Sequence, residues 1–594
     1  MKNKKYIALN LKKIIPIVLS FISTLGINGL ITITSKQVTN NSFVYFIFFA
    51  LFLFIFSKIK NLKKEYTIFS IIFSVILSLI LIIGSQLEFY SEIIWSFTTL
   101  IKIIALSISI FPLNYLLLKY IDEFKIQKSD NINYKKIFVI TFLIILFFNF
   151  LVFLALYPGE YGYDAGFQIM EILEKDVQIT SHFSLLFCFI LAKVVNLGKV
   201  LFGSYQVGFG IYCFLQMIFL SYVAAKITVF CAKRIPNKII YFINVLFFSF
   251  FPLYTLMTIS ATQDSVFAGL FCLIILNVIE LIENKDYWEN KLKPIYLGML
   301  IFLLCSIRNN GFYCILISIP FIFLACKNKK VAVLLISIIP LFAYKIYSGP
   351  VFNILGVTKT DTLREMLSIP SQQFDMVYNY NLKVFSEEEL KQLKKFYPEI
   401  DNFKYYPYRQ SIADPTKSVL NNNYAKLNLK DYISLWASIG VKDPENYVEA
   451  FLLNSLGFWY PNKNYNDDRM YHPYIEIEML DAAKWNPRYV QIKRESKFPI
   501  YEKILNITIG KNAWKRIPVI STIFTTGTYF IIFIFLFLLT ILRRNFKYML
   551  PISIILGLYA TLFLSPVAVF RYCFPIIMAS PLMINLILYQ KKKD

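Results

Sequence analysis

Residues 137–157 read IFVITFLIILFFNFLVFLALY, a run that contains no charged side chain. A helix rises about 1.5 Å per residue, so a run of this length can cross the roughly 30 Å of hydrocarbon in a bilayer. Similar apolar runs recur along the whole chain of 594 residues, and only 16% of the residues are charged. A soluble domain carries about 25%. The sequence therefore predicts an all-α, multi-spanning membrane protein.

The distribution of positive charge predicts about fourteen transmembrane helices. Lys and Arg exceed Asp and Glu by 61 to 37 (net charge +24), and the excess lies in short clusters beside apolar runs, such as residues 58–64 and 543–547. Such clusters mark cytoplasmic loops, so the charge predicts topology and not a nucleic-acid surface. An even number of spans places both termini in the cytoplasm. The predicted spans lie near 14–34, 42–57, 67–84, 93–118, 137–157, 205–231, 238–259, 265–283, 294–308, 311–326, 331–348, 517–541, 549–567 and 572–589.

This layout divides the chain into four segments. A polar segment interrupts the apolar runs and is predicted to be a mostly helical domain outside the cytoplasm, inserted before the last three spans; Ser386 and Glu389 in it predict a helix with a capping box. The segments are an extension of four helices (1–136), a core (137–348), the polar segment (349–516) and the C-terminal helices (517–594).

Two stretches of the core lie between spans. Residues 158–182 form the acidic loop, which we predict to lie on the outer face. Residues 183–203 are predicted to be an amphipathic helix in the outer interface, because a further crossing here would place Lys233 and Arg234 outside.

Cysteine and histidine usage limits the chemistry. All eight Cys lie in or beside apolar runs, which predicts buried thiols and not a disulfide framework. The chain has only two His, which excludes a His-rich metal site. The acids form no recognisable ligand pattern, so we assign no metal ligands and no certain cofactor, and the use of a divalent metal stays open.

The acidic loop contains the first candidate for catalysis. Residues 157–168 read YPGEYGYDAGFQ, in which Pro158 and Gly159 turn the chain as it leaves the membrane. Glu160 and Asp164 would then lie close to the outer surface, where a carboxylate can act as a general base. The alternative is an ordinary solvated loop acid.

Other charged residues are predicted on the same face. Asp264, in SATQDSV, starts a span, where a carboxylate also serves as an N-cap. Arg308 and Arg571 occupy short outer turns that are otherwise nearly free of basic residues. They predict a site for a phosphate group, or simple snorkelling anchors.

Several motifs, in this order along the chain, resemble those of the GT-C superfamily of membrane glycosyltransferases, in a bacterial branch. The resemblance runs from about residue 140 to the C-terminus and leaves out the first four spans. It departs from the branch pattern at Phe183, Gln263, Phe374 and Asp375. The motifs are YPGEYGYDAGFQ (157–168), SHFSLL (181–186), FGSYQVGFGIYCFLQ (202–216), SATQDSVF (260–267), SIRNNGF (306–312), LSIPSQQ (367–373), ADPTK (413–417), LW (435–436), DPENYVEAF (443–451), GFWYP (457–461) and FRYCFP (570–575).

The resemblance implies sugar transfer with inversion from a polyprenyl-phosphate donor to a cell-envelope glycan on the outer face of a bacterial plasma membrane. Asp164 would be the catalytic base, and the two arginines would stabilise the leaving phosphate. The partners would be the lipid-linked donor, the glycan acceptor and membrane lipids, with no nucleic acid. The implied substrate-binding residues are Glu160, Gln168, His182, Asp264, Arg308, Asn309, Arg571 and Tyr572.

Two other functions fit part of the sequence. A transporter or flippase of lipid-linked saccharides would explain the many spans and the intramembrane Lys102, but not the acidic loop or the polar segment. A non-catalytic scaffold for envelope assembly would explain the departures from the motif pattern. The aromatic residues of GFWYP (457–461) suit stacking on sugars or simple core packing.

Overall fold

The regular secondary structure of the described residues is helical. The structure is a computed structural model, which describes residues 2–34, 42–59, 62–124, 133–326, 329–401, 412–461, 477, 479, 486–517 and 519–590. Within these ranges the only β structure is four isolated bridges. Among the described residues, ten helices are long and apolar enough to cross a membrane, or up to eleven if the bent pair α9 (Lys238–Phe250) and α10 (Pro252–Thr258) is counted as one span. The chain is a multi-pass membrane protein.

Each of the fourteen predicted spans coincides with a helix, but four of these helices are short. Nine of the predicted spans meet the length and hydropathy criteria, and α9 with α10 form a tenth. Helix α7 (Leu185–Phe202), which we placed in the interface, also meets the criteria. The multi-spanning architecture is confirmed, whereas the count by length is ten to eleven. The short helices are α2 (Ser42–Lys58), α12 (Leu292–Ile307), α13 (Asn310–Ala325) and α26 (Thr526–Leu542).

Helices α11 (Gln263–Glu283) and α28 (Phe570–Tyr589) pack against each other at the centre of the core. Most of their residues are buried, so these two helices face protein on nearly all sides. They bring the start of α11 beside the start of α28, although about 300 residues separate them. The remaining helices that meet the length criterion are α1 (Lys2–Thr34), α3 (Lys64–Tyr90), α4 (Phe97–Glu123), α5 (Tyr134–Ala155) and α8 (Tyr205–Arg234). Helices α14 (Lys330–Ile346) and α27 (Met549–Phe563) meet it together with the helical turns that adjoin them, over Lys330–Ile354 and Phe546–Phe563.

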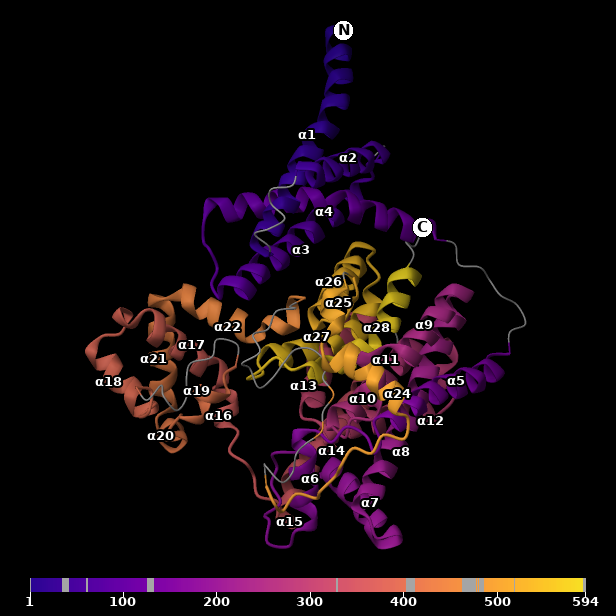
Figure 1. The fold of residues 1–594 in the computed structure, drawn as a ribbon, viewed down its shortest axis with the longest axis vertical. Coiled ribbons are helices and arrows are strands. Elements are labelled where there is room, and N and C mark those ends of the chain that lie inside the picture. The colour runs from indigo at the N-terminus through magenta and orange to yellow at the C-terminus, as the bar shows by residue number, and fades with distance from the viewer. Residues whose placement is uncertain are drawn as a thin grey trace.

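The polar segment has a hydrophobic cluster of its own, built on residues such as Phe374, Phe396 and Tyr432. Figure 1 shows α16 to α22 of this segment grouped to one side of the core, whereas α15 lies near α6 (Tyr163–Leu173) and α24 lies among the core helices. Ser386 caps α18 and exchanges both hydrogen bonds of the predicted capping box with Glu389. Its helices are α15 (Phe352–Ile354), α16 (Leu363–Met366), α17 (Ser368–Tyr380), α18 (Glu387–Phe396), α19 (Asp414–Ser418), α20 (Asn422–Leu427), α21 (Leu429–Lys442), α22 (Pro444–Trp459) and α24 (Pro499–Leu505).

The aromatic residues of GFWYP serve core packing. Phe458, Trp459 and Tyr460 are all buried. The Tyr460 ring lies against Gly84 of α3, and the Tyr460 backbone lies against Gly527 of α26. A Cβ atom at either glycine would collide with Tyr460. The stacking role that we considered for these rings is therefore wrong, since they face protein. All eight cysteines are buried, as predicted.

The contact between α7 and α8 gives a stability prediction. A Cβ atom at Gly208 would collide with the backbone of Val195 on α7, so Gly208→Val should force the helices apart and cost about 1–3 kcal/mol. Gly298→Ala on α12 is the matched control, because its Cβ would make only an ordinary contact 3.6 Å from Pro340. Thermal unfolding of the detergent-purified variants measures the difference. Equal unfolding temperatures for the two variants would contradict the prediction.

Candidate functional site

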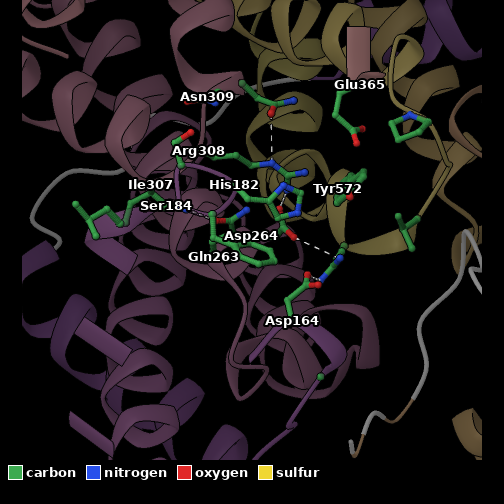
Figure 2. A pocket seen from close by; sticks show the side chains of 18 of the residues that line it. Asp164, His182, Ser184, Gln263, Asp264, Ile307, Arg308, Asn309, Glu365 and Tyr572 are labelled. Carbon is green, nitrogen blue, oxygen red and sulfur yellow. Dashed lines mark hydrogen bonds and ion pairs between the residues drawn. The ribbon is translucent and has the colours of Figure 1, made fainter. Parts of the chain in front are cut away.

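A cavity of about 830 Å³ lies where the core meets the polar segment. Figure 2 shows its charged side chains pointing toward one another from different helices. Chain segments far apart in the sequence line it, with residues drawn from 161–164, 181–185, 263–264, 306–310, 344–352, 414–417 and 566–572, together with Glu365, Ile477 and Met479.

Asp164 enters the cavity from helix α6 (Tyr163–Leu173). Part of the acidic loop is therefore helical. Ala165, Ile169 and Met170 lie on one face of this helix and are buried. Asp164 lies in the first turn, where a carboxylate is favoured. Its Oδ2 accepts a hydrogen bond from Nη1 of Arg571 at 2.5 Å. The carboxylate therefore faces the start of α28 and is not a free loop acid.

Asp264 enters at the start of α11, but it is not the N-cap. The cap is Thr262, whose hydroxyl accepts from the amide of Asp264 and donates to its carboxylate at 3.1 Å. The carboxylate of Asp264 is buried and forms an ion pair with Arg308. Capping by Thr262 leaves the Asp264 side chain available to the cavity.

Arg571 lies between the two carboxylates. Its Nη1 is 2.5 Å from Asp164 and its Nε is 3.6 Å from Asp264. The ring of Tyr572 lies beneath both cations, with the Cζ of Arg308 at 4.2 Å and that of Arg571 at 5.5 Å from its centroid. Charges taken out of water need partners, and here two acids, two guanidinium groups and one aromatic face supply them. The two arginines are thus part of the cavity and not outward-facing anchors.

Most of the predicted site residues line this cavity. Asn309 accepts a hydrogen bond from Tyr344 at the rim, and His182 lines the wall beside Phe183, its ring centroid 4.6 Å away. The predicted residues that line it are Asp164, His182, Asp264, Arg308, Asn309, Arg571 and Tyr572.

Two predicted residues lie elsewhere. Glu160 is 1% exposed, does not line the cavity, and forms an ion pair with Arg494 at 2.7 Å. Gln168, one turn after Asp164 on α6, is also buried outside the cavity lining. Neither of these two predicted residues is therefore brought to the cavity by this structure.

The polar segment adds a charged group that we did not assign to the site. Lys417 lines the cavity with Asp414 and Glu365, to whose carboxylates its Nζ lies at 2.7 and 2.5 Å. The motif ADPTK contains two of these three residues, but the motif alone does not indicate that their side chains line a cavity. Helix α19, which carries Asp414 and Lys417, is attached to the loop before Arg571, because the amide of Ala413 donates to the carbonyl of Pro566 at 2.8 Å.

No group of three or more His, Cys, Asp or Glu side chains that could hold a metal ion occurs among the described residues. The carboxylates of the cavity instead lie against arginine and lysine.

Residues 174–594 match a protein family described as a family of unknown function, DUF6020. The chain belongs to this family. The match begins ten residues after Asp164, so it leaves out Asp164 and the two cavity residues before it. It includes the remaining cavity residues, from Ser181 onward, and thus both arginines. No curated protein and no solved structure shows significant similarity to the chain.

Asp375 connects the cavity wall to the interior of the polar segment and gives a pH prediction. Burial raises the pKa of its carboxyl from 3.8 to about 6, against hydrogen bonds from Thr416 and Asn379 that lower it. Because the folded state holds this proton more tightly, the stability that it contributes is complete below about pH 4 and is lost as the pH rises to about 6. Asp375→Asn should therefore gain stability relative to wild type between pH 4 and pH 6.5, measured by thermal unfolding.

Glu389→Gln is the matched control. Burial would raise the pKa of Glu389, but hydrogen bonds from Lys442 and Ser386 lower it to about 2. Its stabilising effect is therefore constant between pH 5 and pH 7 and is lost only in stronger acid. A pH-independent difference between Asp375→Asn and wild type would refute the role given to Asp375.

Proposed function

We propose that this chain is an inverting membrane glycosyltransferase of the GT-C type. It would move a sugar from a polyprenyl-phosphate donor to a cell-envelope acceptor on the outer face of a bacterial plasma membrane, with both termini in the cytoplasm. One observation carries the proposal: Asp164 and Asp264 converge on Arg571, with Arg308 beside them, in a single cavity. A candidate base and two phosphate-binding groups are then within reach of one substrate.

The reaction needs one base and one anion site. Asp164 takes the proton of the acceptor hydroxyl, whose oxygen attacks the anomeric carbon from the face opposite the phosphate. The bond between that carbon and the phosphate oxygen breaks, so the configuration inverts and the lipid phosphate leaves as an anion. An anionic leaving group needs cationic stabilisation rather than a general acid, which Arg308 and Arg571 would provide.

The ion pairs suggest how the donor would activate the base. A guanidinium that holds a carboxylate occupies the oxygen that would accept the proton. A phosphate presents more charge and a matching fork geometry to Arg571. When the donor phosphate takes over Arg571, the carboxylate of Asp164 loses the contact at 2.5 Å and can accept the hydrogen of the acceptor hydroxyl instead. Donor binding would thus precede proton transfer.

The cavity also offers apolar surface for the donor lipid. Phe352, Met479 and Val569 line it together with the charged residues, so a lipid-linked phosphate would meet both kinds of surface at once. The acidic loop, the α7 helix and the polar segment occur in the order that the resemblance implies. We also propose that all fourteen of the predicted spans, including the four short helices, cross the membrane in a GT-C-like arrangement.

Asp164→Asn tests the proposed base. Radiolabelled sugar transfer from polyprenyl-phosphate donors in membranes should fall about a hundredfold or more in this variant, because the amide cannot accept the proton. Asp176→Asn is the matched control in the same loop, since Asp176 lies outside the cavity in an exposed ion pair. Equal transfer by wild type and Asp164→Asn would remove Asp164 from the mechanism. No transfer by wild type with intact donors would favour the transporter or the scaffold.

Arg571→Gln tests the phosphate site independently of turnover. Binding of polyprenyl phosphate to the purified protein should weaken about tenfold or more, because charge-assisted hydrogen bonds are lost. Arg488→Gln serves as the control, because Arg488 is exposed and outside the cavity. Unchanged binding in Arg571→Gln would contradict the assignment of the leaving phosphate to this arginine.

A further inference from the structure

Residues 486–498, here called the strap, cross the acidic loop without forming a helix. Figure 1 shows this part of the chain running as a long extended trace to α24. The strap amides of Glu495 and Lys497 donate to the carbonyls of Tyr157 and Leu154, both at 2.8 Å. The carbonyl of Val490 accepts from the hydroxyl of Tyr161 at 2.9 Å. The strap therefore follows the chain from the end of α5 to the start of α6.

The centre of this contact is a buried ion pair. Nη2 of Arg494 lies 2.7 Å from Oε1 of Glu160, and the two side chains are 15% and 2% exposed. A carboxylate buried to this extent is tolerated only with a partner. Arg494 is thus the counter-charge that allows Glu160 to stay in the interior.

Glu160 also joins the two segments that carry the carboxylates of the cavity. Its amide donates to the carbonyl of Ile259 at 2.9 Å, and its carbonyl accepts from the amide of Ala261 at 3.1 Å. Asp164 follows four residues after Glu160, and Asp264 follows three residues after Ala261. The position of the Glu160 backbone therefore sets the spacing between Asp164 and Asp264.

The segment at 259–261 is also hydrogen-bonded to helix α8. The side-chain amide of Gln216 donates to the carbonyls of Thr258 and Ser260, at 3.1 and 2.8 Å. The segment at 259–261 is thus fixed to α8, whereas the segment at 157–162 depends on the strap for its outer contacts. Displacing Glu160 would move Asp164 relative to Asp264.

We propose that Arg494 is a positioning residue, which fixes the spacing of Asp164 and Asp264 by neutralising Glu160 from the far side of the acidic loop. This role rests on the proposed function for its effect on catalysis, but its structural effect can be measured without any turnover. Arg494 does not line the cavity, so it acts through Glu160 and not on the substrate.

The experiment compares Arg494→Gln, Arg494→Lys and the double variant Glu160→Gln/Arg494→Gln by hydrogen–deuterium exchange of the purified protein. In Arg494→Gln the peptides that contain the amides of Glu160 and Ala261 should exchange about tenfold faster or more, since their hydrogen bonds open more often. Arg494→Lys keeps the charge, and the double variant removes both charges, so both should exchange at rates close to wild type. Arg488→Gln, whose pair with Asp176 is exposed, is the control and should also match wild type.

Sugar transfer by the same variants provides the second readout. In Arg494→Gln the kcat should fall about a hundredfold with little change in KM, because misplaced groups slow the reaction without removing a substrate contact. Exchange that is unchanged in Arg494→Gln, or that the double variant fails to restore, would overturn the positioning role. If wild type transfers no sugar, the proposed function fails while the exchange measurements still decide the role of Arg494.

Discussion

The contact of Arg571 with two carboxylates is the interaction on which the rest of the site depends. Asp164, Asp264 and Arg571 come from three different helices, and each would be costly to bury alone. Their mutual attraction draws the starts of α6, α11 and α28 to one place. The packing of α11 on α28 and the capping of α11 by Thr262 then determine which way these side chains point.

The same principle operates at several levels of the structure. Glu160 is buried because Arg494 neutralises it, and Lys417 is buried against Asp414 and Glu365. At the opposite ends of the helices, Arg234 pairs with Glu283, and Arg543 pairs with Asp122 of the N-terminal extension. In three of these pairs, Glu160 with Arg494, Arg234 with Glu283 and Arg543 with Asp122, the partner comes from a distant part of the chain. Such pairs specify which helices are neighbours, a choice that apolar packing alone leaves open.

Much of this architecture could be predicted from the sequence, because hydropathy and charge alternation act locally. The apolar runs predict the long helices, and the basic clusters predict that Asp164, Asp264, Arg308 and Arg571 share one face. The structure brings these four residues together in one cavity. The fates of Glu160 and Lys417 could not be predicted, because they depend on partners such as Arg494, which lies 334 residues away. The rings of GFWYP were ambiguous for a related reason, since only the distant Gly84 shows what Tyr460 packs against.

The long separation between Glu160 and Arg494 has a consequence for how the protein is made. A ribosome adds about 5–20 residues per second, so the interval between these two residues corresponds to roughly half a minute of synthesis. The acidic loop would leave the insertion machinery well before its counter-charge exists. A nascent chain that stops short of the strap would lack the Arg494 counter-charge of Glu160, and the two carboxylates would lack the support described above. The contacts that hold the acidic loop are therefore completed only late in synthesis, and a truncated chain would be without them.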